Sequence, residues 1–182
     1  MNTTYLVIAV ILGLAIIAAI VVPMFASRKR SERLQDQFGS EYDRTVESIG
    51  DVKKAQAELE GRKKYVKSLD IHPLSPVERE RYLADWARVQ SKFVDEPGQA
   101  IVDADRLIME VMHLRAYPIA DFEQRAADVS VSYPEVVSNY RAAHEIALKN
   151  QEYQANTEEL RQAMIYYRSL FEELLEIEPA VA

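Results

Sequence analysis

The sequence holds a few residue groups whose types and spacing could do chemistry, beginning with three histidines, His72, His113 and His144. Glu110-x-x-His113 matches the Glu-x-x-His pair of di-iron bundles, but such sites need a second pair and two further glutamates on facing helices. Arg141 stands three residues before His144, so no second pair exists. We therefore expect His113 at a helix surface and predict no metal site.

A second candidate group, Asp103-x-Asp105, resembles a metal or nucleotide-sugar motif. On a helix, residues two apart point about 200° away from each other, so the two carboxylates diverge. Asp103, Arg106 and Glu110 instead stand at i, i+3 and i+7, a spacing that predicts surface ion pairs.

The single tryptophan, Trp86, could form a ligand cage with Tyr82 and Phe93. Their helical spacing favours a place in a hydrophobic core instead. The chain has no cysteine, which excludes disulfides, thiolate metal sites and a cysteine nucleophile. There is also no Gly-rich phosphate loop and no evident Ser/His/Asp arrangement. We predict no catalytic residue and no cofactor, which favours a non-enzymatic role without deciding it.

The densest polar group beside a turn follows Pro118, and its members Asp121, Glu123, Arg125 and Asp128 are the candidate partner-binding residues. Loops and helix ends carry binding functions more often than helix faces do. A short helix capped by Asp121, with no binding role, explains the same residues.

Residues 5–25 contain no charged side chain and, as a helix, would span ~31 Å, the thickness of a bilayer core. The run is too long for a signal peptide, and no basic residue precedes it, so an uncleaved anchor is favoured over a cleaved signal. The small-xxx-small pairs Ala9/Gly13 and Ala15/Ala19 are compatible with a dimer of membrane helices.

Basic residues follow this segment directly: Arg28, Lys29, Arg30 and Arg33. The positive-inside rule then predicts a single-pass protein of the cell membrane with its C-terminal domain in the cytoplasm. The same four side chains are candidates for contact with anionic lipid headgroups, although setting the topology alone would explain them.

Charge divides the remaining chain. Residues 28–69 carry 11 Lys/Arg and 8 Asp/Glu, a net charge of +3, whereas residues 70–182 carry 11 Lys/Arg and 21 Asp/Glu, a net charge of −10. We predict a tail and transmembrane helix over 1–27, a basic juxtamembrane stem over 28–69, an acidic bundle over 70–177 and a C-terminal tail over 178–182. An acidic domain argues against nucleic acid as a partner.

Breakers and apolar spacing predict an all-α fold. Helices are expected over 27–38, 41–49 and 51–69, then from a Ser75-Pro76-x-Glu78 capping box to about Val94, and from Pro97 to before Pro118. A short helix should start at Asp121, another after a second capping box at Ser132–Glu135, and the last after Asn156 or Thr157. Arg62 interrupts the apolar stripe of 51–69, which predicts partial burial or weak pairing. About four main helices close the bundle, with the stripes around Trp86 and Phe171 in one core.

Two runs of residues resemble a family of uncharacterised bacterial proteins. One is Trp86-x-x-Val89-Gln90-x-x-Phe93-Val94-Asp95-x-Pro97, and the other runs from Asp121-Phe-Glu-Gln-Arg-Ala-Ala-Asp128 to Tyr140-Arg141-x-Ala143-His144. The resemblance covers most of residues 38–175. It implies an N-terminal apolar segment and a helical C-terminal part, but no reaction and no site residue.

These observations favour a membrane-anchored helical module that binds another protein or assembles a complex at the membrane. An enzyme or small-ligand binder with a polar pocket between helices is the first alternative, and an exported, surface-held domain is the second. The sequence names neither the partner nor the oligomeric state.

Overall fold

The structure is a computed structural model that describes residue 12, residues 27–118 and residues 120–176. These residues form helices and loops and contain no strand, which confirms the all-α fold class. None of the helices in this part of the chain is both long and apolar enough to cross a bilayer. The expected transmembrane segment, residues 5–25, lies outside the described residues apart from Leu12.

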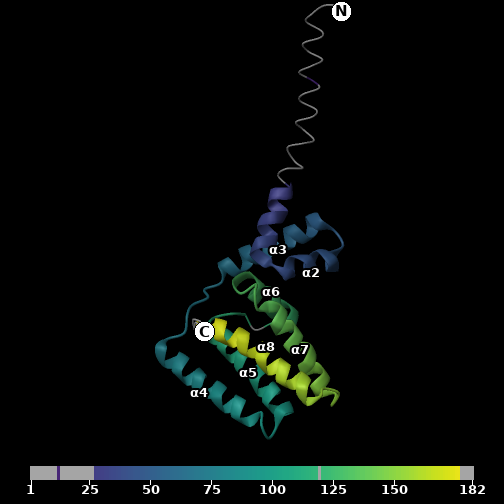
Figure 1. Cartoon of the computed structure of the whole chain (residues 1–182). Helices are drawn as coiled ribbons and strands as arrows, with labels where there is room; N and C mark the ends of the chain where they lie inside the picture. The colour runs from purple at the N-terminus through teal and green to yellow at the C-terminus, as the bar shows by residue number, and fades with distance from the viewer. Residues whose placement is uncertain (1–11, 13–26, 119, 177–182) are drawn as a thin grey trace, which may run out of the picture.

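Three helices form a small unit at one end of the molecule, here called the proximal lobe (Figure 1). They are the helix over residues 27–38, α2 (Ser40–Ile49) and α3 (Val52–Ser68). Gly39 and Gly50 make the two sharp turns with φ of 51° and 70°, a left-handed conformation that glycine adopts without a steric cost. The stem therefore folds back on itself around its own core, made by Leu34, Phe38, Tyr42 and Leu59.

Residues 69–75 connect the lobe to α4 (Pro76–Lys92), which begins at the predicted capping box: Ser75 and Glu78 exchange both reciprocal hydrogen bonds. After a tight turn, α5 (Pro97–Leu114) starts with proline in its first turn. Both starts follow the sequence expectation, since proline lacks the N–H that a first-turn residue leaves unbonded.

The last third of the chain begins with α6 (Phe122–Ser132), capped by Asp121, and continues through α7 (Val137–Gln151) to α8 (Thr157–Leu174), which a capping box at Asn156 opens. The second capping box expected at Ser132–Glu135 is wrong. Ser132 is the last residue of α6, and α7 starts after Val136 with no side-chain cap. The local capping motif does not start a helix there because α6 continues through Ser132. The apolar face of α6 extends to Val131, which packs against the core of the proximal lobe.

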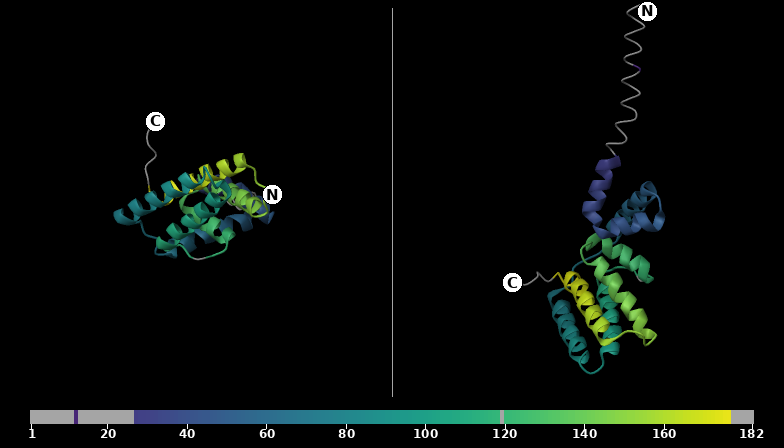
Figure 2. Two further views of the ribbon diagram at one scale, coloured as in Figure 1. Left: turned by 90° about the horizontal axis from the view of Figure 1, so that it is seen from below. Right: turned by 45° about the vertical axis from the view of Figure 1, so that its right-hand side comes forward.

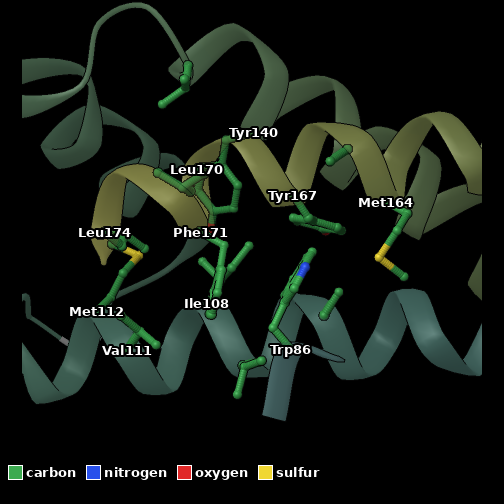
Figure 3. Packing of buried hydrophobic residues seen from close by; sticks show 14 of the residues in the cluster. Trp86, Ile108, Val111, Met112, Tyr140, Met164, Tyr167, Leu170, Phe171 and Leu174 are labelled. Carbon is green, nitrogen blue, oxygen red and sulfur yellow. The ribbon is translucent and has the colours of Figure 1, made fainter. Parts of the chain in front are cut away.

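The main core lies among α4, α5, α7 and α8, the four main helices that the sequence predicts (Figure 3). Trp86 of α4 stacks on Phe171 of α8 with ring centroids 4.6 Å apart, so the two aromatic stripes share one core as expected. Tyr140 and Tyr167 are fully buried beside them. In both upright views the proximal lobe sits at the end of this bundle where α6 ends and α7 begins (Figure 2).

A buried arginine, Arg115, ties the connector to the C-terminal end of the bundle. Its guanidinium donates to the carbonyl oxygens of His72 (3.1 Å) and Leu174 (2.7 Å), to the Tyr133 hydroxyl (2.7 Å) and to Glu176 (2.9 Å). Because Leu174 ends α8, its carbonyl has no partner within the helix, and Arg115 caps it.

Candidate functional site

A cleft of about 410 Å³ opens where the proximal lobe meets the bundle. Three helices supply its walls: α2, the first turn of α6, and one face of α7. The lining residues are Arg44, Asp121, Phe122, Glu123, Arg141, His144, Glu145 and Leu148.

The floor of the cleft is the buried guanidinium of Arg141. It donates to both oxygens of Glu41, from Nη2 to Oε1 (2.9 Å) and from Nε to Oε2 (3.2 Å), and from Nη1 to Oε2 of Glu123 (2.7 Å). Burial disfavours its charge, but the two carboxylates outweigh burial and raise the pKa of Arg141. The pKa of Glu123 is lowered, since Arg141 outweighs the opposing effect of burial.

Glu41 is shared between helices. Its side chain is 2% exposed and also accepts from Nη1 of Arg62 at 3.1 Å, while Nη1 of Arg44 lies 3.9 Å from the same oxygen. This explains the arginine that interrupts the apolar stripe of α3: Arg62 is mostly buried and paired with α2. The network joins α2, α3, α6 and α7 beneath the cleft.

One wall of the cleft is apolar and aromatic. The rings of Phe122 and His144 stack in parallel with centroids 3.6 Å apart, and Leu148 is 47% exposed one turn further along α7. His144 is half-buried, and burial lowers the pKa of its imidazole. Its Nδ1 has no hydrogen-bond partner among the described residues.

The rim carries two exposed carboxylates, Asp121 and Glu145, that form no ion pair within the part of the chain that the structure describes. Asp121 accepts the backbone N–H of Gln124 at 2.9 Å through one oxygen, which stabilises the start of α6. A cation placed at the rim would therefore meet free negative charge beside an apolar wall.

The structure separates the four residues that the sequence singled out. Asp121 and Glu123 line the cleft. Arg125 turns away and donates to the carbonyl of Ala120 (2.6 Å) and the hydroxyl of Tyr140 (3.3 Å).

The fourth, Asp128, is 1% exposed and hydrogen-bonded to Gln124, and burial raises the pKa of its carboxyl. It does not reach the surface on which Asp121 lies. Sequence reasoning missed the α7 side of the site, although Arg141, His144, Glu145 and Leu148 stand at i, i+3, i+4 and i+7, the spacing of a single helix face.

The four basic residues that follow the apolar segment, Arg28, Lys29, Arg30 and Arg33, fall into two groups. Arg30 and Arg33 both reach Glu60 of α3, at 2.7 Å and 3.1 Å, so they hold the lobe together. Arg28 and Lys29 are exposed and have no ion pair among the described residues.

The other motifs have structural roles. Asp103 pairs with Lys92 (2.8 Å) and Arg106 (3.0 Å), which confirms the surface ion pairs. His113 is exposed, as expected. Across the described ranges, no group of three or more acidic or histidine side chains is arranged to hold a metal ion.

Comparisons of the chain with protein-family models, with curated proteins and with solved structures found no match, so the resemblance of its two motifs to a bacterial family stays a prediction.

Proposed function

We propose that this chain is a single-pass membrane protein whose helical head binds another protein at the cytoplasmic face of the cell membrane. The uncharged run over residues 5–25 supports the anchor, and the basic residues that follow support the orientation. The cleft between α2, α6 and α7 supports the binding role.

One observation carries the proposal: two exposed carboxylates that form no ion pair among the described residues line the same cleft as a partly exposed apolar wall. Asp121 and Glu145 can accept from a lysine or arginine, while Phe122 and Leu148 can cover a neighbouring apolar side chain. The matching partner is a protein segment with a basic residue next to an apolar one. Such a pair combines a charge-assisted hydrogen bond with hydrophobic burial.

The charge of the head favours the same class of partner. Residues 70–182 carry a net charge of −10, and an acidic surface attracts a basic segment from a distance and raises its rate of association. The rim charges set the orientation of the bound segment, and the apolar wall supplies contact area.

Site-specific photo-crosslinking in the cells that make the protein tests this proposal. A benzoylphenylalanine at Leu148 should give a discrete adduct with one partner, whereas the same group at Ile165, 45% exposed on α8, should not. Matched exposure makes Ile165 a fair control. Equal labelling from both positions would count against the cleft.

A charge-reversed variant sharpens the test. Asp121→Lys with Glu145→Lys should abolish the Leu148 adduct, because a basic segment would be repelled. Glu80→Lys with Glu152→Lys changes the net charge equally at exposed positions outside the cleft and should leave the adduct unchanged.

The orientation has its own test. A reporter active only in the cytoplasm should be active when fused after Ala182. If a reporter that works only outside the cell membrane were active at that position instead, the proposed topology would be wrong and the partner would bind on the outer side.

A small basic ligand is a second candidate, favoured by the unpartnered Nδ1 of His144 and by a cleft volume within the range of ligand sites. Such a ligand should raise the melting temperature of the wild-type protein but not that of His144→Phe, which keeps the stacking and removes the nitrogen.

A further inference from the structure

Two helices of the proximal lobe are aligned in parallel. The helix over 27–38 and α3 run side by side in the same direction, as their side-chain contacts show. Gln56 donates to Ser31 (2.7 Å), Glu60 accepts from Arg33 (3.1 Å), and Lys63 donates to Gln37 (2.9 Å). Contacts thus advance together along both helices.

This pairing fixes which end of α3 faces the membrane. Continued back by one turn, it places residues 52–54 level with residues 27–29, the point at which the described chain follows the apolar segment. In both upright views, α3 begins on the side of the lobe where the helix over 27–38 begins (Figures 1 and 2). The turn between α2 and α3 therefore lies at the membrane-proximal end of the lobe.

The turn exposes apolar side chains at that end. Ile49 is 39% exposed and Val52 is 46% exposed, on either side of Gly50. The left-handed Gly50 ends α2, and the Asp51 side chain accepts from the backbone N–H of Lys54 at 3.0 Å, so the turn is well defined. Two aliphatic side chains are held outward without covering any core.

Exposed cations surround this apolar pair. Lys53 and Lys54 stand on the first turn of α3, level with Arg28 and Lys29, and none of the four has an ion pair among the described residues. Glu32 and Glu47 lie nearby, and the Asp51 carboxylate is occupied by the backbone of its own helix. When Arg30, Arg33 and Glu60 are added to these residues, basic side chains outnumber acidic ones at this end of the lobe. The bundle, in contrast, carries a net negative charge.

We infer that the α2–α3 turn is a second membrane contact, at which Ile49 and Val52 enter the headgroup region of the bilayer while Lys53 and Lys54 bind anionic lipid headgroups. Apolar side chains flanked by lysines suit an anionic membrane surface, which attracts cations and accepts aliphatic groups at its interface. The inference rests on the proposed membrane anchor. It gives the lobe a function: the head is held against the bilayer at two points rather than hanging from one helix.

Depth-sensitive fluorescence on the full chain tests this contact. Because the natural chain lacks cysteine, Ile49→Cys provides a single site for the dye NBD. The protein is placed in nanodiscs of phosphatidylcholine with or without phosphatidylserine, some carrying lipid with a spin label near the headgroup. We expect a blue-shifted emission, loss of most of it to the spin label, and a larger loss with phosphatidylserine. Tyr153→Cys is the control, since Tyr153 is 97% exposed in the α7–α8 turn at the opposite end of the bundle. Equal, weak quenching at positions 49 and 153 would overturn the inference.

Two pairs of lysine substitutions at opposite ends of α3 remove the same charge and so test the role of its position. Lys53→Gln with Lys54→Gln should remove the extra quenching caused by phosphatidylserine, whereas Lys64→Gln with Lys67→Gln, at the far end of α3, should keep it. If both pairs of substitutions removed the extra quenching equally, the quenching would depend only on the net charge of the protein, and a specific contact at the turn would be rejected. Co-migration with nanodiscs separates the two proposals. A chain that does not co-migrate refutes the anchor and this contact together, while one that co-migrates without quenching at position 49 refutes the contact alone.

Discussion

Arg141 holds carboxylates from two different helices, and at the scale of single residues this pairing is the clearest source of stability at the lobe–bundle junction. Removing one partner of a buried ion pair costs about 3–5 kcal/mol, because the remaining charge stays buried. Arg62 still reaches Glu41, so we expect Arg141→Met to destabilise near the lower end of this range.

Urea unfolding measures this loss. Arg168→Ala is its control, since Arg168 pairs with Glu172 on the exposed face of α8 and such pairs contribute about 0.3–0.5 kcal/mol. If both variants unfolded at the same urea concentration, the Arg141 network would contribute no more than a surface pair.

His144 predicts a pH dependence of stability. Burial lowers its folded pKa below the unfolded value of about 6.5, so the unfolded state binds the proton more readily. Stability from this residue is complete above about pH 6.5 and is lost as the pH falls toward the folded pKa. In His144→Gln, the free energy of unfolding, measured at several pH values, should depend less on pH below about pH 6.5 than it does in the wild-type protein. An unchanged slope in that variant would assign the titration to another group.

The sequence predicted part of the candidate site. Asp121 was recognisable because capping residues obey local rules, and it lies on the cleft rim. Arg141 was not recognisable as a site residue, because its partner Glu41 is 100 residues away and the local sequence around either residue does not indicate the other. Asp128 looked like a surface residue by composition, and only the packing of α6 shows that it is buried.

At the scale of elements, helix starts test the local rules. Ser75→Ala should cost about 1 kcal/mol because it removes a cap from α4. Ser132→Ala should cost less than about 0.5 kcal/mol, since this exposed serine caps no helix. Chemical denaturation of both variants measures the difference. A larger loss at Ser132 would restore the second capping box.

The stack of Trp86 on Phe171 joins α4 to α8. Trp86→Ala should cost roughly 3–5 kcal/mol, the usual penalty for emptying a large aromatic site, and should leave the bundle close to unfolding. Trp86→Phe keeps an aromatic ring and removes an indole N–H that has no partner among the described residues, so it should cost less. Calorimetry should show one transition for the bundle in each case. A melting temperature unaffected by Trp86→Ala would place this side chain outside the core.

At the scale of the whole molecule, the helical class and the four-helix bundle followed from apolar periodicity and from breakers such as Pro97 and Gly50. The folding back of the stem did not. Gly39 and Gly50 marked turns, but their direction depends on Leu34 and Phe38 meeting Leu59 across the lobe. Such contacts are tertiary, and no local pattern encodes them.

Truncation tests the lobe as a unit. A fragment over 27–182 should be soluble and strongly helical, because it keeps both cores. A fragment over 41–182 lacks Leu34 and Phe38, which are 1% and 0% exposed, so Tyr42 and Leu59 would lose their cover. We expect it to be less helical and to self-associate, as measured by circular dichroism and sedimentation. Equal behaviour of the two fragments would show that the helix over 27–38 is dispensable for folding.

The separation of Glu41 from Arg141 also sets an order of events during synthesis. Ribosomes add about 5–20 residues per second, so Glu41 exists for about 5–20 seconds before Arg141 is made. Throughout that interval the buried Glu41 carboxylate can pair with Arg62 of the lobe but not with Arg141 of α7, and for most of it Val131 is not yet there to cover the lobe core. The lobe is therefore made before the bundle but stays incomplete until α7 has been added, and a nascent chain stalled before α7 would present an open lobe core.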